Sequence, residues 1–167
     1  MKPTPADPEA WNAYLAEGNA KQARKRVAAD VILRNADGDY LLVKPTYKPG
    51  WDLPGGMAEA NEAPDGAAVR ELREELGLSI ELQRLLVVDW VTPHGPWDDQ
   101  IAFIFDGGVL ESGAADLSPK DGELSEVKFV SVDAAKSLLP VRLLRRFESA
   151  VQVLTDGIPR YLRDGVS

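Results

Sequence analysis

Short apolar runs alternate with turn-forming stretches along most of the chain. Residues 27–33 and 40–43 are rich in aliphatic side chains, and Asp37-Gly38 between them favours a hairpin turn. Similar apolar runs predict further strands at residues 51–53, 80–91, 101–109 and 126–130. The polar, turn-rich connections are expected to be loops, at residues 92–99 and 111–122.

Helical signals mark other segments. Asp7 followed by Pro8 predicts the start of a short helix that ends near Leu15. A second helix is bounded by Pro64, which suits a first helical turn, and by Gly77, which suits the left-handed position after the last turn. Two more helices are predicted at residues 133–138 and 141–154. Because strands and helices interleave, the pattern predicts an α/β fold with three layers, α/β/α.

The composition excludes several kinds of site and of partner. The chain of 167 residues has no cysteine and one histidine, His94, which excludes disulfides, a thiolate nucleophile and a multi-histidine zinc site. The formal net charge of −8 argues against a nucleic-acid polymer as partner, because a phosphate backbone requires a basic surface. A small polyphosphate remains compatible with an acidic protein when cations bridge the two.

No targeting signal is visible in the sequence. The first residues, MKPTPADPEA, lack the apolar run of a secretory signal, and no apolar stretch approaches the length of a membrane span. We therefore expect a cytoplasmic protein that has no membrane partner.

The helix at residues 64–76 carries the most distinctive chemistry. Glu71, Glu74 and Glu75 stand at positions i, i+3 and i+4, so the three carboxylates share one helical face. Carboxylates this close repel one another, and Mg²⁺, which prefers oxygen ligands, is their natural partner. The alternative is a solvated acidic face whose charges are balanced by Arg70 and Arg73.

The segment GMAEANEAPDGAAVRELREELGL, residues 56–78, resembles the Nudix box of the Nudix hydrolases at every fixed position. The matching residues are Gly56, Glu62, Arg70, Glu71, Leu72, Glu74, Glu75, Gly77 and Leu78. Weaker similarity extends over about residues 26–155. The resemblance implies a Nudix-type α/β/α sandwich with a mixed β-sheet, over residues 26–160. Residues 1–25 are then an N-terminal extension with a short helix, and residues 161–167 are a C-terminal tail.

The resemblance also implies an activity and a cofactor. Nudix hydrolases cleave a diphosphate linkage with Mg²⁺, for which Mn²⁺ can substitute. A related group of isomerases uses a catalytic cysteine, which this chain lacks. The expected partner is a small phosphorylated nucleotide as substrate, and a homodimer is left open.

Roles for individual residues follow from the same resemblance. Glu71, Glu74 and Glu75 are expected to bind the metal, together with the backbone carbonyl of Gly55. Arg70 is expected to orient the glutamates, and Glu62 to support the connection between loop and helix. The catalytic base is left open between Glu123, Glu126 and one of the box glutamates.

The substrate is signalled more weakly. Pro93 stands fifteen residues after Leu78, an offset at which hydrolases of ADP-sugars resemble one another; the alternative is an ordinary turn proline. Trp97 and Trp51 could stack on a nucleobase, and Lys44 could contact phosphate or sugar, although surface solvation explains Lys44 equally well. Three functions are therefore carried forward: an ADP-sugar hydrolase, a nucleoside triphosphate or damaged-nucleotide hydrolase, and a nucleotide-binding regulator without catalysis.

Overall fold

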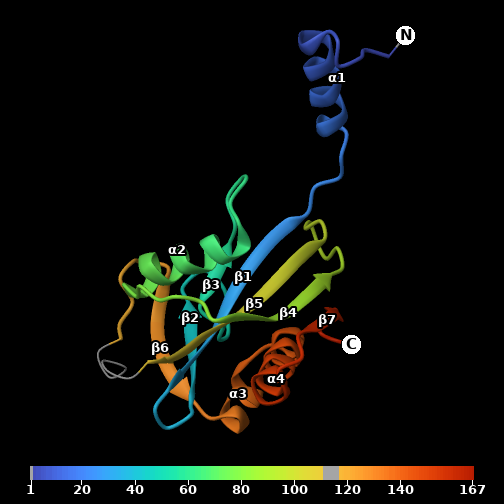
Figure 1. The fold of residues 1–167 in the computed structure, drawn as a ribbon. Helices are drawn as coiled ribbons and strands as arrows, with labels where there is room; N and C mark the ends of the chain where they lie inside the picture. Colours follow the sequence, from blue (N-terminus) through green and yellow to red (C-terminus); the bar gives the residue numbers. More distant parts are fainter. Residues whose placement is uncertain (1, 111–116) are drawn as a thin grey trace.

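Seven strands form one sheet with helices on both faces in the part of the chain that the structure describes (Figure 1). The structure is a computed structural model that describes residues 2–110 and 117–167. The strands are β1 (Arg26–Asn35), β2 (Tyr40–Pro45), β3 (Gly55–Met57), β4 (Arg84–Val91), β5 (Gln100–Leu110), β6 (Leu124–Val130) and β7 (Arg160–Arg163). The helices are α1 (Pro8–Ala20), α2 (Pro64–Leu76), α3 (Val132–Leu138) and α4 (Val141–Asp156).

The sheet is mixed. Its order is β6-β2-β1-β5-β4-β7, and β3 pairs with β1 beside this path. The pairs β1·β5 and β4·β7 are parallel, whereas β1·β2, β1·β3, β2·β6 and β4·β5 are antiparallel. The predicted α/β fold with a mixed sheet is therefore confirmed.

Strand β1 joins the two halves of the sheet and contributes to both cores. Alternate residues of a strand point to opposite faces. Ala29, Val31 and Leu33 accordingly pack in the core beneath α2, while Ile32 packs in the core beneath α3 and α4. Phe147 of α4, fully buried, is among the largest side chains of the second core.

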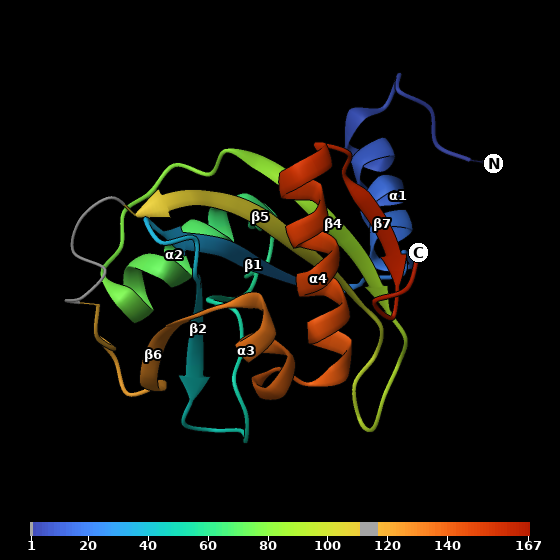
Figure 2. The same cartoon turned by 90° about the horizontal axis from the view of Figure 1, so that it is seen from below.

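Helices α2 and α4 complete the layers on opposite faces of the sheet. Helix α2 packs against β1 and β3, and α4 packs against β4 and β7. Figure 2 shows α3 and α4 in front of the sheet, with α2 behind it. None of the described helices combines the length and hydrophobicity that crossing a bilayer requires.

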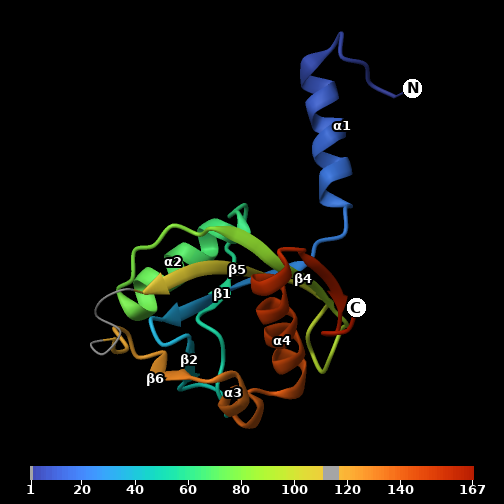
Figure 3. The ribbon, with the colours of Figure 1, turned by 60° about the horizontal axis from the view of Figure 1, so that its bottom comes forward.

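Helix α1 stands apart from this arrangement. It projects from the start of β1 into open space (Figures 1 and 3), and none of its residues is buried. Asp7 caps its first turn by accepting a hydrogen bond from the Ala10 amide at 3.1 Å, as the sequence predicts. The helix runs to Ala20, beyond the end expected near Leu15.

Other boundaries also differ from the expectation. Residues 51–53 form one isolated bridge, between Val43 and Asp52, rather than a strand, since Pro54 cannot donate to a ladder. Strand β4 begins at Arg84 instead of residue 80. Strand β7 was not expected; the boundary placed at residue 160 falls within it. Of the predicted loop at residues 111–122, positions 111–116 lie outside the described residues.

Candidate active site

Helix α2 positions the acidic residues. Pro64 occupies its first turn, and Gly77, with a φ of 68°, ends it in the left-handed conformation, so the predicted bounds of residues 64–76 are confirmed. Because one side of the helix packs on the sheet, the three glutamates differ in exposure. The side chain of Glu71 is 16% exposed and that of Glu74 is 50% exposed, whereas the residue Glu75 is only 5% exposed.

The chain bends at Pro54 and enters β3 with two glycines; we call residues 54–56 the glycine turn. Gly55 permits a close approach to β1, and Gly56 permits a close approach to α2. A Cβ on Gly55, whose φ is 139°, would lie 2.3 Å from the backbone oxygen of Ala29, so only glycine fits there. A Cβ on Gly56 would lie 2.5 Å from Cδ of Glu71. The missing side chain of Gly56 therefore provides the space in which the Glu71 carboxylate lies.

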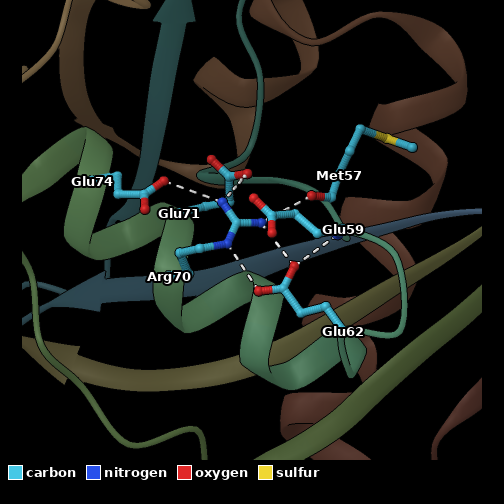
Figure 4. Close-up of polar contacts among 6 residues, drawn as sticks. All are labelled: Met57, Glu59, Glu62, Arg70, Glu71 and Glu74. Atoms are coloured by element: carbon cyan, nitrogen blue, oxygen red, sulfur yellow. Dashed lines mark hydrogen bonds and ion pairs between the residues drawn. The ribbon is translucent and has the colours of Figure 1, made fainter.

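Arg70 binds several acceptors at once (Figure 4). Its Nε and Nη2 donate to the Glu62 carboxylate at 2.9 Å each, and its Nη1 donates to Glu71 at 2.9 Å and to Glu74 at 3.2 Å. Nη2 also donates to the Met57 carbonyl at 3.1 Å. The hydrogen bonds from Arg70 lower the pKa of Glu62 to about 2. Arg70 thus ties the helix to the preceding loop and fixes the direction of two glutamates.

Glu75 differs from the other two glutamates. Its Oε2 is buried and has no hydrogen-bond partner among the described residues. Burial, and after it the charges of Glu71, Asp121 and Glu123, raise the pKa of Glu75 to about 8. A buried carboxylate oxygen without a donor is unfavourable, so the position favours a bound cation.

Two further carboxylates, Asp30 and Asp52, lie near Gly55, and the sequence pattern alone does not distinguish them as site residues. The Asp30 Oδ1 lies 3.0 Å from the position that a Cβ on Gly55 would take, and Asp52 forms an ion pair with Lys48. Burial, and then the charge of Asp52, raise the pKa of Asp30 to about 7. The available signal was a lone aspartate within the apolar run of residues 27–33.

The donor set fits a hard divalent cation such as Mg²⁺. Carboxylate and carbonyl oxygens are the ligands that Mg²⁺ prefers. Oε2 of Glu75, which has no hydrogen-bond partner among the described residues, is an oxygen of this kind. As the side chains lie, the described residues contain no trio of His, Asp or Glu close enough to bind one ion. Arg70 holds Glu71 and Glu74 toward itself, so these two side chains must turn if they are to join Glu75 around a metal.

Two candidates for the base stand at the start of β6: Glu123 directly precedes the strand, and Glu126 lies within it. The charge of Glu123 contributes to raising the pKa of both Glu71 and Glu75. Glu123 therefore lies within electrostatic reach of the acidic group, our name for Glu71, Glu74 and Glu75. Its backbone oxygen accepts a hydrogen bond from the Thr46 amide at 2.8 Å. Glu126 instead forms an ion pair with Lys44 across β2 and β6.

The expected substrate residues fall into two groups. Lys44 pairs with Glu126, and its Nζ lies 5.9 Å from the centre of the Trp51 ring, while Trp51 packs against the core beneath α4. Pro93 and Trp97 lie in the loop between β4 and β5, beside the start of β1 (Figure 1). The structure therefore separates Lys44 and Trp51 from Pro93 and Trp97.

Trp97 is the exposed aromatic of that loop. Its side chain is 55% exposed, and the Arg26 guanidinium lies 4.5 Å from the ring centre. Arg26 begins β1, and Ala29, three residues along, pairs with Gly56. At about 3.3 Å per residue, the two positions lie roughly 10 Å apart along the strand. His94 pairs with Trp97 across the loop through backbone hydrogen bonds of 3.0 Å, which is a structural contact.

Comparison with known proteins agrees with the geometry. A family model described as the NUDIX domain matches residues 24–148, which run from before β1 into α4. The chain belongs to the Nudix family. Strand β7 lies beyond the matched residues and still pairs with β4.

Curated relatives match different shares of the chain. It is 44% identical over 66 residues to diphosphoinositol polyphosphate phosphohydrolase 3-alpha of Mus musculus, covering 39% of this chain and 40% of that protein. It is 27% identical over 143 residues to the NAD-capped RNA hydrolase NudC of Pseudomonas aeruginosa, covering 77% of this chain and 49% of that protein. The chain thus spans less than half the length of these relatives.

Solved Nudix structures share the fold. The NUDIX domain of Shewanella oneidensis NrtR, complexed with ADP ribose, superposes with a TM-score of 0.68 at 19% identity, covering 86% of this chain and 97% of that one. A UDP-X diphosphatase superposes with a TM-score of 0.67 at 19% identity, covering 93% of this chain and 87% of that one.

Substitution of Gly56 tests whether the space beside Glu71 matters for the cation. Gly56→Ala is expected to keep the fold, because the added methyl meets the flexible end of a side chain, and to weaken Mn²⁺ binding at least about tenfold by displacing the carboxylate. Gly66→Ala on α2 is the matched control, since its Cβ meets nothing closer than 3.9 Å. Calorimetric Mn²⁺ titrations decide the matter; equal affinities in the two variants would contradict the assignment.

Proposed function

We propose that this protein is a Mg²⁺-dependent hydrolase, also active with Mn²⁺, that cleaves the diphosphate linkage of a nucleoside diphosphate derivative, with an ADP-sugar as the preferred substrate. The observation that carries the proposal is the buried Oε2 of Glu75, which has no hydrogen-bond partner in the part of the chain that the structure describes, near Glu71 and the glycine turn. Family membership supports it, because the matched residues contain this whole group.

Binding is the first task of the site. A diphosphate and the acidic group repel each other, so neither approaches the other unaided. Glu71, Glu74 and Glu75, with the Gly55 carbonyl, would hold Mg²⁺, which when bound neutralises phosphate oxygens and makes a water more acidic. Burial of Glu75 against the sheet restricts its motion, and a restricted ligand needs little reorganisation when substrate arrives.

Arg70 acts as a positioning residue in this proposal. Its side chain is only 19% exposed, and it donates hydrogen bonds to Glu62, Glu71, Glu74 and Met57. It therefore orients the acidic side chains and does not contact the substrate. The link to Glu62 keeps the loop after β3 against α2. Loss of this link would leave the carboxylates in place on the helix but poorly directed.

Glu123 is our proposal for the base. Its side chain is exposed, yet its charge reaches Glu71 and Glu75, so it can face solvent and the acidic group. It would take a proton from the attacking water while the water oxygen bonds to phosphorus. The bond from that phosphorus to the bridging oxygen breaks, and the other phosphate leaves with the bridging oxygen.

The choice of an ADP-sugar rests on the loop between β4 and β5. Pro93 has the offset seen in ADP-sugar hydrolases, and Trp97 offers an exposed ring roughly 10 Å along β1 from the glycine turn. The similar NUDIX domain of NrtR is complexed with ADP ribose, which supports a site of this size. The net charge of −8 disfavours a capped RNA of the kind named for the Pseudomonas relative.

A substrate panel tests the proposal. ADP-ribose, a UDP-sugar, 8-oxo-dGTP, dATP, a diphosphoinositol polyphosphate and an NAD-capped RNA would each be incubated with and without Mg²⁺. ADP-ribose is expected to be cleaved with the highest kcat/KM, and chelation of the metal should abolish the reaction. Turnover in metal-free buffer, or no turnover of any member with Mg²⁺ or Mn²⁺, would contradict the proposed hydrolase.

Glu75 is the residue whose replacement separates activity from stability. Glu75→Gln should lower kcat at least about a hundredfold, as the loss of a catalytic electrostatic contact often does. In metal-free buffer at about pH 9, above the pKa of about 8 at which Glu75 ionises, its melting temperature should hold or rise, because the substitution removes a carboxylate that burial and neighbouring charges destabilise. Glu81→Gln, at an exposed position, is the control. Near wild-type turnover by the Glu75 variant would show the assignment to be wrong.

Trp97 tests the role of the loop. Trp97→Ala should raise KM by a factor matching roughly 1–3 kcal/mol of lost stacking. The effect on kcat should be smaller, because stacking on a remote base stabilises ground and transition states alike. Trp97→Phe keeps an aromatic face and should recover most of the affinity. Steady-state kinetics with ADP-ribose and dATP decide this; an unchanged KM in both variants would remove Trp97 from the substrate site.

A further inference from the structure

Arg146 of α4 is a nearly buried cation that faces the sheet. Its side chain is 12% exposed, and its Nε lies 2.7 Å from Oδ2 of Asp89 on β4. Asp89 is fully buried, and the Gly165 amide donates to both of its carboxylate oxygens at 3.1 Å. Asp89 therefore holds the guanidinium of Arg146 from its Nε side.

The outer nitrogens of Arg146 take no part in this contact. In the part of the chain that the structure describes, Nη1 and Nη2 form no hydrogen bond, and the buried Nε meets Asp89 without hydrogen-bond geometry. Burying a carboxylate and a guanidinium costs stability unless their hydrogen-bonding atoms are satisfied. The pair of Asp89 and Arg146 therefore leaves the Nη edge for a further acceptor.

Asp30 of β1 lies on the same side of the sheet as Arg146. Alternate residues of a strand point to one face, and Ile32, two residues after Asp30, packs in the core beneath α3 and α4. Burial and the charge of Asp52 raise the pKa of Asp30, and the charge of Arg146 lowers it, so Arg146 lies within electrostatic reach of Asp30. No hydrogen bond to the Asp30 carboxylate is found among the described residues. A free acceptor and free donors thus lie near each other.

Asp30 and Arg146 adjoin the glycine turn. Asp30 pairs with Gly55 in the register of β1 and β3, at a spacing of about 5 Å between strands. Asp52 connects the two sides, because its charge acts on Asp30 and also on Glu75 of the acidic group. A phosphate bound by a cation at the acidic group would therefore place the next group of the substrate near Asp30.

The same face of β1 leads from Asp30 toward Trp97. Ala28 and Arg26 share this face, because they stand two and four residues before Asp30. The Arg26 guanidinium lies 4.5 Å from the centre of the Trp97 ring. A nucleotide that extends from the glycine turn to Trp97 passes Asp30 first and Arg26 last. Because the ribose of a nucleotide lies between phosphate and base, the ribose is the group that reaches Asp30.

We propose that Asp30 and Arg146 bind the 2′,3′-diol of the nucleoside ribose, so that the protein selects ribonucleotides over 2′-deoxyribonucleotides. One hydroxyl donates a hydrogen bond to the Asp30 carboxylate, and the neighbouring hydroxyl oxygen accepts one from Nη1 or Nη2 of Arg146. This assignment rests on the proposed hydrolysis beside the glycine turn and states which nucleotides that site accepts.

A diol fits these two side chains better than an anion or an apolar group does. Hydroxyls both donate and accept, as a free carboxylate beside a free guanidinium edge requires. A second phosphate would be repelled by Asp30 and Asp52, and an apolar group would leave the hydrogen-bonding atoms of Asp30 and Arg146 without partners. In dinucleotide-binding folds, a carboxylate binds a ribose hydroxyl through the same kind of hydrogen bond.

Kinetics with a matched pair of substrates test the assignment. ADP-ribose is compared with the analogue that lacks the 2′-hydroxyl of its adenosine, at about pH 8.5, above the pKa of about 7 of Asp30. Wild-type kcat/KM should favour ADP-ribose roughly tenfold to a hundredfold, because the analogue leaves a charged group without its hydrogen-bond partner. Asp30→Ala and Arg146→Lys should each bring this ratio toward one, by lowering kcat/KM for ADP-ribose and leaving that for the analogue nearly unchanged.

The two variants are chosen to preserve the fold. Arg146→Lys keeps a positive charge for Asp89, and Asp30→Ala removes a carboxylate that burial disfavours. The matched controls are Arg145→Lys and Asp133→Ala, at exposed positions, and both should keep the wild-type ratio. A purely structural role for Asp30 and Arg146 would lower kcat/KM for the two substrates alike. A wild-type ratio near one, or a ratio that neither variant changes, would overturn the assignment.

Product binding separates this assignment from the proposed hydrolysis. Calorimetry in the presence of Mg²⁺ measures the affinities of AMP and 2′-deoxy-AMP without turnover. AMP should bind the wild-type chain at least about tenfold more tightly, and Arg146→Lys should remove the difference. If neither substrate is cleaved, the proposed hydrolysis fails, and these two affinities still decide the assignment. Equal affinities, or no binding of either nucleotide, would contradict it.

Discussion

Repulsion among carboxylates that the fold holds together is the constraint on which the site depends. Like charges repel more strongly as they approach one another and as burial removes water from between them. Burial, and then the charges of neighbours that include Glu71 and Glu123, raise the pKa of Glu75. Arg70 offsets part of the charge, but its bonds go to Glu62, Glu71 and Glu74. Within residues 2–110 and 117–167, no group donates a hydrogen bond to Oε2 of Glu75.

The sheet and the glycine turn maintain this arrangement. Ala67, Ala68, Leu72 and Leu76 bury one side of α2, which fixes the rotation of the helix and therefore the position of its acidic side. Only glycine at residue 55 permits the approach of β3 to β1, and glycine at residue 56 leaves space for Glu71. Hydrophobic packing thus holds carboxylates near one another although they repel. Such an arrangement lowers the stability of the fold and is typical of a functional site.

The parts of this structure that could be predicted from sequence have local causes. Pro64 and Gly77 set the ends of α2 because each acts on its own backbone, and Asp37-Gly38 gives the turn between β1 and β2 for the same reason. Strand β7 could not be found in this way. It is four residues long, Arg160 and Arg163 interrupt its apolar character, and its extended conformation depends on pairing with β4.

The same distinction between local and long-range causes applies to the residues of the candidate site. The spacing of Glu71, Glu74 and Glu75 predicts a shared face, but only tertiary contacts decide that Glu75 is buried and Glu74 exposed. The ion pair between Lys44 and Glu126 joins residues 82 positions apart, so no local pattern favours it over a contact with phosphate. Asp30 enters the site through the pairing of β1 with β3, which is also a long-range contact.

Paramagnetic broadening by Mn²⁺ in nuclear magnetic resonance spectra of the ¹⁵N-labelled chain tests the central claim most directly, namely that the acidic group beside the glycine turn is where a divalent cation binds. The account predicts that substoichiometric Mn²⁺ broadens the amide signals of Gly55, Gly56, Glu71 and Glu75 first, while those of Trp11 and Tyr161 stay sharp. Broadening that begins at another group of residues, or none at all, would contradict it.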